Sequence, residues 1–274
     1  TVPFFQKWKN EIESCINPRT NKPLAIKTKQ NIYSYFRALI NYAIKMDYLS
    51  TNNLTKLGNF KDKNSIEPKR KMDYYTADEY KSFSNTAYKI AKSSNKIVDW
   101  DYYVFFSIAF YTGLRKGEIF ALKWSDIKDN YLSVSRSITQ KLKGADRETP
   151  PKNKSSVRTL QIPKPLIKIL NEHKARYKTN SHFTDDFRIC GGERPIRDSS
   201  VTRANELIAK AAGIKKIRIH DFRHSHVSLL ANEGINIQEI ARRLGHSNIE
   251  MTWNTYSHLY PREEERAVEI LNKI

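Results

Sequence analysis

The amino-acid sequence predicts a mainly helical protein with a small antiparallel β-sheet, an α+β fold, organised in two domains. Apolar residues recur every three or four positions along most of the chain, as they do on one face of a helix. Around residues 132–134 and 160–162, apolar and polar residues alternate instead, which is typical of strands. A polar, Lys-rich run at 56–71, with Gly58 and Pro68, has almost no core-forming pattern and indicates an interdomain linker.

The first domain, assigned to residues 1–66, is expected to be helical. Residues 2–16 can form an amphipathic helix. A longer helix is predicted over 32–44, where seven apolar residues share one face: Ile32, Tyr35, Phe36, Leu39, Ile40, Ala43 and Ile44. We assign 67–71 as the linker proper and 72–274 as the second domain.

The second domain opens with a helix start signal, because Thr76 is followed three residues later by Glu79 in the pattern of a capping box. Residues 100–111 are apolar nearly all round and end at Gly113, which predicts a buried central helix. The two predicted strands are separated by a polar loop that contains Pro150 and Pro151, and the pattern is helical again from Ser199 to the end.

Composition limits the classes of function that the chain can have. The chain has 274 residues, enough for a real core, so folding needs no metal or disulfide support. Lys and Arg number 48 and Asp and Glu 29, and the difference gives a formal charge of +19. This charge indicates a polyanionic partner such as nucleic acid. Ribosomal proteins, nucleases and membrane-surface proteins are also basic, so motifs must decide among them.

The sequence favours a soluble, cytoplasmic protein without membrane contact. Cys15 and Cys190 lie far apart and in no CxxC pattern, which fits two thiols in a reducing cytosol. No run approaches the ~18 consecutive apolar residues of a membrane span, and the N-terminus does not resemble a signal peptide. Because residue 1 is Thr rather than Met, we allow for a further segment before it.

Four short motifs carry candidate chemistry. Arg115 stands in Thr-Gly-Leu-Arg-Lys-Gly-Glu-Ile, directly after the buried helix ends, and Glu118 could hold its guanidinium from the same helical face. His220 and Arg223, in His-Asp-Phe-Arg, point the same way at the start of a helix. His246 follows in Leu-Gly-His, and Tyr256 comes ten residues later. Taken alone, the Arg and His motifs also fit ordinary surface ion pairs or solvated side chains, and a lone Tyr is more often part of the core than a nucleophile.

Taken together and in this order, the motifs closely resemble the tyrosine recombinases, the family of phage and transposon integrases. The family pattern is matched at Arg115, His220, Arg223, His246 and Tyr256, and Glu118 matches the acidic residue after the first Arg. The family's remaining member is a Lys in a loop between two strands. Lys152 is our choice for it, with Lys154, Lys143 and Lys141 as alternatives in the same stretch.

The resemblance implies exchange of one phosphodiester for another through a covalent link to Tyr256, without metal, nucleotide or other cofactor. Arg115 and Arg223 would neutralise the phosphate in the transition state. His220 would accept the tyrosine proton, His246 would bond the phosphate, and Lys152 would protonate the leaving 5′ hydroxyl. The product would be a 3′-phosphotyrosyl link.

The resemblance also implies the partners. We expect double-stranded DNA attachment sites held in a C-shaped clamp of two domains, a homo-tetramer on DNA, an excision helper protein and a bacterial host. Candidate phosphate contacts are Lys27, Lys29, Lys69, Arg70, Lys71 and Lys154, although exposed lysines are usually only solvated. The tail at 262–274 places Ala267, Ile270, Leu271 and Ile274 on one face, which could dock on its own domain or on a neighbouring subunit.

Three rival interpretations stay open at this point. His220 and His224 have the i, i+4 spacing of a zinc metalloprotease helix, but no third ligand is evident. Residues 228–246 fit a helix-turn-helix, which would suit a DNA-binding regulator without catalysis. A type IB topoisomerase would share the chemistry of a recombinase.

Overall fold

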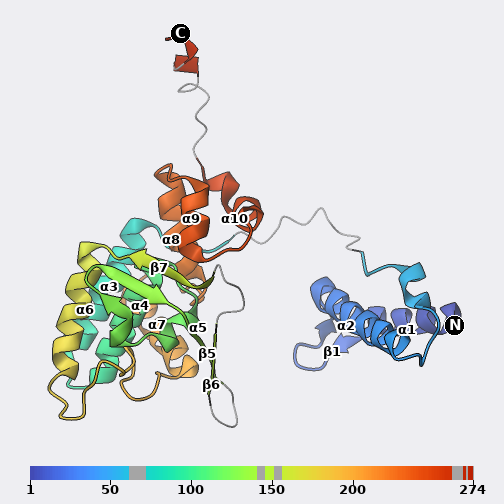
Figure 1. Cartoon of the computed structure of the whole chain (residues 1–274), viewed down its shortest axis with the longest axis horizontal. Coiled ribbons are helices and arrows are strands. Elements are labelled where there is room, and N and C mark those ends of the chain that lie inside the picture. The colour runs from blue at the N-terminus through green and yellow to red at the C-terminus, as the bar shows by residue number, and fades with distance from the viewer. Residues whose placement is uncertain (62–71, 141–145, 151–155, 261–267, 270, 274) are drawn as a thin grey trace. The chain divides into compact units, whose positions relative to one another are not determined.

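The computed structural model describes residues 1–61, 72–140, 146–150, 156–260, 268–269 and 271–273. The chain divides into two compact units, Thr1–Lys71 and Met72–Ile274, which are described one at a time (Figure 1). Both are mainly helical and their strands form small antiparallel sheets, which confirms the predicted α+β class. The linker predicted at 67–71 lies outside the described residues. No helix in the described ranges has the length and hydropathy that crossing a bilayer requires.

The first unit packs two helices around a small apolar core. Its elements are α1 (Val2–Ser14), β1 (Ile16–Asn17), β2 (Lys22–Pro23), α2 (Ile26–Lys45) and the 3-10 helix η1 (Asn53–Leu57). β1 and β2 pair antiparallel. The buried apolar side chains of this core are Tyr33, Ile40, Leu54 and Phe60.

Two expectations for the first unit were wrong in detail. The face predicted for the helix at 32–44 included Tyr35 and Leu39, but these residues are 77% and 61% exposed. Tyr33 is buried in their place, and its hydroxyl donates to the carbonyl oxygen of Leu54 at 3.2 Å. The side of α2 that meets its neighbours is therefore rotated from the predicted one. Phe60, within the run interpreted as linker, is also buried in this core.

The second unit is built around one buried helix, α4 (Ile97–Thr112), as predicted from its apolar composition. α3 (Ala77–Ser93) packs on it and begins with the predicted capping box of Thr76 and Glu79. α6 (Lys164–Tyr177) and α8 (Asp221–Asn232) also contact α4. Figure 1 shows α8, α9 (Ile237–Leu244) and α10 (Ile249–Tyr256) gathered together in orange and red. The remaining helical segments are α5 (Lys116–Ala121), η2 (Trp124–Asp126), α7 (Asp198–Ala211) and η4 (Ser257–Leu259).

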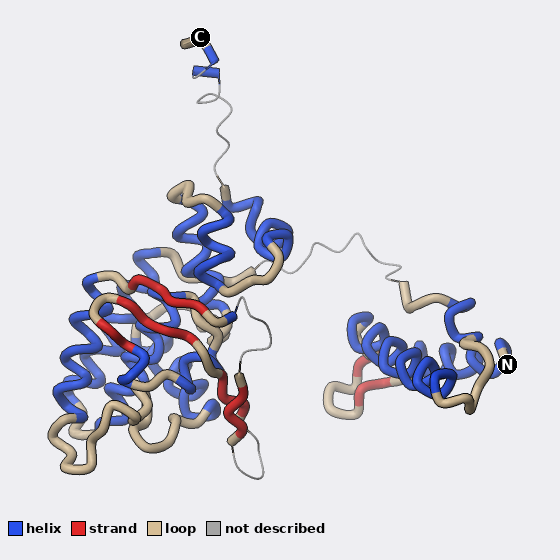
Figure 2. The backbone as a smooth tube through the Cα atoms, viewed as in Figure 1, coloured by secondary structure: helices blue, strands red, loops and turns tan. Residues whose placement is uncertain are grey.

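Two sheets lie in this unit (Figure 2). β3 (Ile127–Lys128), β4 (Tyr131–Val134) and β7 (Arg158–Gln161) form the antiparallel sheet predicted from the alternation, with Leu132 opposite Leu160. A second pair, β5 (Ser137–Thr139) and β6 (Arg147–Thr149), falls within the stretch interpreted as a polar loop, so that interpretation was wrong for these residues. This hairpin contacts α5 and therefore reaches the site described below.

The C-terminal part only partly matches the predicted continuous helical pattern. Residues 212–220 connect α7 to α8 without a helix. In the tail, Val268, Glu269 and Leu271 are helical, whereas Ala267, Ile270 and Ile274 of the predicted face lie outside the described residues. Both cysteines are free, Cys15 exposed and Cys190 buried.

Candidate active site

Arg115 is positioned by the end of the buried helix α4. Gly113 terminates that helix in the left-handed region at φ +65°, and a Cβ there would lie 2.7 Å from the ring of His226. This combination requires glycine, because any other residue would have a strained backbone at this φ and a Cβ that clashes with His226. Arg115 follows as the residue before α5, with its side chain 40% exposed. Its backbone N–H and its guanidinium both donate to Glu118, at 2.9 and 3.1 Å.

Glu118 links Arg115 to a second arginine that sequence reasoning missed. Arg158, in β7, donates from both terminal nitrogens to the Glu118 carboxylate at 3.2 and 2.9 Å, and both side chains are nearly fully buried. Burial alone would raise the pKa of Glu118, but the hydrogen bonds and charges of Arg158 and Arg115 lower it. Arg158 also donates from Nε to the carbonyl oxygen of Arg243 at 2.8 Å, which ties this cluster to the end of α9.

Arg223 lies in the first turn of α8 and is only 3% exposed. Its guanidinium donates to the carbonyl oxygens of Gly113 at 2.7 Å and Leu244 at 2.9 Å. Burial, together with the charge of Arg115, lowers its pKa to about 9. Two residues at the ends of α4 and α9 thus hold the Arg223 fork close to Arg115, although the two arginines are far apart in sequence. A phosphate at this point would relieve their mutual repulsion.

His246 follows Gly245, which ends α9 in the left-handed region at φ +64°. Its Nε2 lies 2.7 Å from Nη2 of Arg223, and its Nδ1 lies 2.7 Å from Oγ1 of Thr252. A guanidinium can only donate, so Nε2 must accept and the proton of the neutral ring is on Nδ1. Burial and the charges of Arg223 and Arg115 lower the pKa of His246 to about 4.

Tyr256 ends α10 and is 3% exposed, packed in the apolar cluster of α8, α9 and α10. Its hydroxyl is hydrogen-bonded to Nδ1 of His224, not to His220. Burial raises the pKa of Tyr256 to about 12, while the charge of Arg223 acts in the opposite direction. Within the described residues, His220 contacts this arrangement through the ring of His224, 5.0 Å away between centroids.

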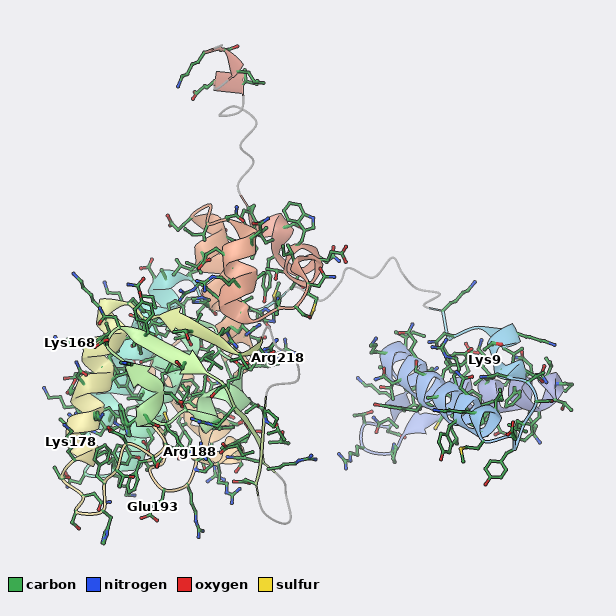
Figure 3. All side chains as sticks on the ribbon, in the orientation of Figure 1. Lys9, Lys168, Lys178, Arg188, Glu193 and Arg218 are labelled. Atoms are coloured by element: carbon green, nitrogen blue, oxygen red, sulfur yellow. The ribbon has the colours of Figure 1, made fainter. Side chains whose placement is uncertain are left out.

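The start of α8 is fixed by an ion pair. The Asp221 carboxylate, 1% exposed, accepts from the backbone N–H of Arg218 at 2.8 Å and from its guanidinium at 2.8 Å. The Arg218 side chain is 74% exposed on the surface, where Figure 3 labels it. This pair orients the turn that carries His220 and His224.

A cavity of about 300 Å³ opens beside Arg115 and His246. Its walls include Ser137 and Thr139 of β5 and Thr149 of β6, so the hairpin that sequence reasoning missed forms one side of it. Pro150 and Ser156 also line this cavity. The stretch between them, which contains the candidate lysines Lys152 and Lys154, lies outside the described residues.

The structure thus brings Arg115, Glu118, Arg223, His246 and Tyr256 into one cluster, with His220 at its edge. Of the candidate DNA contacts, Lys27 is exposed and Lys29 donates to the carbonyl oxygen of Glu13 at 2.8 Å, both in the first unit. Lys69, Arg70, Lys71, Lys141 and Lys143 lie outside the described residues.

Two of the rival interpretations use residues of this cluster. The predicted helix-turn-helix is present as α8 and α9, whose ends hold Arg223 and Leu244 beside His246. Of the zinc pair, His224 contacts the Tyr256 hydroxyl through Nδ1. Across the parts of the chain that the structure describes, no group of three or more His, Cys, Asp or Glu side chains is arranged to hold a metal ion.

Comparison with known proteins gives one consistent result. Residues 74–263 match the model of the phage integrase family. The ICEBs1 integrase of Bacillus subtilis (strain 168) is 30% identical over 261 residues, which cover 92% of this chain and 67% of that protein. A XerC-like tyrosine recombinase of Caldanaerobacter subterraneus is 30% identical over 287 residues, covering 96% and 70%.

Solved structures show a similar fold. The Tn1549 transposon integrase, in complex with a circular intermediate DNA, has a TM-score of 0.72 at 20% identity and covers 100% of this chain and 85% of its own. A lambda integrase dimer bound to a core site has a TM-score of 0.56 at 20% identity, covering 93% and 78%. The family match and the relatives of 30% identity, rather than these distant structures, show that the chain belongs to the phage integrase family of tyrosine recombinases.

Proposed function

We infer that the chain is a site-specific DNA recombinase, an integrase that cuts and rejoins DNA strands to integrate or excise a mobile element. Its relatives are named as integrases and tyrosine recombinases. The observation that carries the inference for this chain is the convergence of Arg115, Arg223 and Tyr256 in one unit. Arg223 is buried and contacts Gly113 and His246.

The geometry supports a transesterification. The two guanidinium groups of Arg115 and Arg223 match the non-bridging oxygens of a phosphate and would stabilise the charge that grows in the pentavalent transition state. Tyr256 supplies the oxygen that attacks phosphorus. The covalent phosphotyrosyl link keeps the energy of the phosphodiester bond until a 5′ hydroxyl attacks the phosphorus in return. His246 lies beside Arg223 to contact the phosphate, and Lys152 is assigned to protonate the leaving 5′ oxygen. Neither step uses a metal or a nucleotide.

The proposed partner is double-stranded DNA carrying attachment sites. The Tn1549 transposon integrase has been solved with circular intermediate DNA, and lambda integrase as a dimer on a core site. A formal charge of +19 favours the same kind of partner here. We further propose that the two units clamp the duplex through contacts that include Lys27 and Lys29. Exchange between two duplexes implies four subunits on DNA. Separately, we propose an excision helper protein as a partner and action in the cytoplasm of a bacterial host.

The decisive experiment is covalent capture. Wild type and Tyr256→Phe are mixed with a nicked attachment-site duplex, and the products are separated under denaturing conditions. The wild type should give a protein–DNA band that resists denaturant, and Tyr256→Phe, which lacks only the attacking oxygen, should give none. A regulator without catalysis would give no band with either protein. Joining of strands from two different duplexes would then separate a recombinase from a topoisomerase.

A further inference from the structure

His224 lies between the nucleophile and a buried carboxylate. Its Nδ1 is hydrogen-bonded to the hydroxyl of Tyr256, and its Nε2 is 3.9 Å from Oδ1 of Asp221. The His224 side chain is 13% exposed, and its ring centroid is 5.5 Å from that of Tyr256. The order carboxylate, imidazole, hydroxyl is the one by which a histidine activates a weak oxygen nucleophile.

The surroundings select the tautomer of His224. A lone pair on Nε2 would face the Asp221 carboxylate, whereas an N–H there faces it favourably. The neutral ring therefore carries its proton on Nε2, and Nδ1 accepts from the Tyr256 hydroxyl. Asp221 is itself held in place by Arg218.

The groups that face His224 are Asp221 and Arg223 of its own helix, His220 and Arg218 directly before that helix, and Tyr256 of α10. Burial, with the neighbouring His220, lowers the pKa of His224 to about 4, although Asp221 acts in the opposite direction. The ring is therefore neutral at pH 7, and its Nδ1 lone pair is available to the phenol.

We propose that His224, rather than His220, is the catalytic residue that takes the proton from Tyr256 during strand cleavage. The inference deepens the proposed recombinase function and rests on it. As the phenol oxygen forms its bond to phosphorus, the O–H bond breaks and the proton passes to Nδ1. The 5′ oxygen leaves with a proton from a separate donor, so charge and atoms balance.

The positive ring that results is stabilised by the Asp221 carboxylate near Nε2. In the rejoining step a 5′ hydroxyl attacks phosphorus, and His224 returns its proton to the departing phenol oxygen. The same lone pair on Nδ1 is then restored, so one group serves both directions of the reaction.

The test uses His224→Asn in the full chain. The asparagine oxygen stands near the position of Nδ1 and can still accept from the phenol, but it cannot take the proton. Single-turnover formation of the covalent complex on a nicked attachment-site duplex should fall about 100-fold or more at pH 7. His220→Asn is the direct comparison and should lose much less. His182→Asn, at an exposed residue, is the matched control and should behave as wild type.

The pH profile separates proton transfer from mere positioning. Wild type should be nearly independent of pH around neutrality, because His224 is already neutral there. In His224→Asn the rate should rise about tenfold per pH unit, since only the phenolate fraction of Tyr256 reacts below its pKa. Replacing Tyr256 with difluorotyrosine, a more acidic phenol, should shrink the defect of His224→Asn.

The outcomes are distinct. If wild type itself forms no covalent complex, the recombinase proposal fails. If wild type reacts and His224→Asn reacts equally fast, or is slow with an unchanged pH profile and no gain from difluorotyrosine, the recombinase proposal stands and the role of His224 is overturned. The same holds if the changed pH profile appears in His220→Asn instead.

Discussion

The guanidinium of Arg223 donates to Nε2 of His246 at 2.7 Å. This contact occupies the one lone pair that the neutral His246 ring has left, because Nδ1 donates to Thr252. His246 therefore has no N–H directed at a phosphate in this arrangement, and it can donate one through Nε2 only after that nitrogen gains a proton. The Arg223 fork is already bound to two main-chain carbonyls, which fix the arginine in place before any phosphate binds.

The first prediction concerns that fork. Arg223→Lys keeps the charge but cannot hold Gly113 and Leu244 while it bonds a phosphate with a second nitrogen. We expect covalent capture to slow by about 100- to 1000-fold, the usual loss of one transition-state donor. DNA affinity, which depends on many phosphate contacts, should change little. Single-turnover cleavage and a binding titration measure the two effects, with exposed Arg203→Lys as control. Equal losses in both measurements would contradict a role in the transition state.

A second prediction concerns the buried pair of Glu118 and Arg158. Glu118→Gln leaves the guanidinium of Arg158 buried without its counter-ion, and breaking such a pair typically costs about 3–5 kcal/mol. Urea denaturation of the full chain measures the loss. Lys116→Ala is the control, because its pair with Asp198 is exposed and should contribute under about 1 kcal/mol. A similar loss for both variants would mean that burial of the pair does not matter.

The Glu118 carboxylate should also make the stability of the folded protein depend on pH. The pKa of Glu118 is lowered by Arg158 and Arg115 against the effect of burial, so its unfolded pKa, about 4.3, lies above its folded one. Its stabilisation is therefore fully present above that unfolded value and is lost as the pH falls through the folded value. The gap between wild type and Glu118→Gln should close in acid, as thermal unfolding at a series of pH values can measure.

Sequence reasoning succeeded where the signal is local. The central helix α4 was predicted because its residues are apolar nearly all round and Gly113 follows, and α3 because Thr76 and Glu79 form a capping box. The strands around Leu132 and Leu160 carried their own alternation. In each case the residues that determine the structure are within one element or next to it.

Sequence reasoning failed where the burial or pairing of a residue depends on a partner far away in the sequence. The buried side of α2 could not be predicted because Tyr35 and Leu39 continue the same helical periodicity as the residues that α1 and η1 cover. The β5 and β6 hairpin has three residues in each strand, mostly polar, so its pairing shows no alternation. Arg158 was visible only as one more basic residue, because its role depends on Glu118 and on the end of α9.

The candidate site shows the same division. The order of the motifs, and the resemblance to the tyrosine recombinases that rests on it, indicated Arg115, His220, Arg223, His246 and Tyr256. His224 entered only through its spacing from His220, which suggested a metal. The contact with Tyr256 depends on how α10 packs on α8, and no single-sequence pattern reports that packing.

A third prediction isolates the close approach at Gly245. Its φ of +64° is strained for other residues, and an added Cβ would lie 2.8 Å from Nη1 of Arg158. Gly213 has φ +67° with nothing within 4 Å of an added Cβ. Gly213→Ala is therefore destabilised by backbone strain alone, about 1–3 kcal/mol. Gly245→Ala should be less stable than Gly213→Ala in urea denaturation and should also slow covalent capture. Equal effects of the two variants would show that Arg158 moves aside freely.

A fourth prediction tests the proposed clamp. If the two units together contact about six to ten phosphates, affinity for duplex DNA should fall on the order of a thousandfold or more between about 50 and 200 mM salt, because each contact releases condensed counterions. Fluorescence anisotropy over this range measures the slope. Lys27→Ala should reduce the slope by about one contact without altering cleavage on saturated complexes. A flat salt response would contradict the clamp.

The last prediction tests Lys152 as the proton donor to the leaving 5′ oxygen. Pro150 and Ser156, which flank the stretch that contains Lys152 in the sequence, line the cavity beside Arg115 and His246. A 5′ alkoxide is a poor leaving group and needs a proton, whereas a thiolate leaves without one. Lys152→Ala should therefore slow cleavage about 100-fold or more on ordinary DNA, and regain nearly the wild-type rate when sulfur replaces the bridging 5′ oxygen.

Lys154→Ala is the matched control for Lys152→Ala, because it removes the same charge two residues away. It should weaken binding slightly and should cleave both substrates at rates close to wild type. If the sulfur substrate rescues Lys154→Ala instead, the proton donor is Lys154. If it rescues neither variant, the proton reaches the 5′ oxygen from another group, and Lys141 and Lys143 are the next candidates.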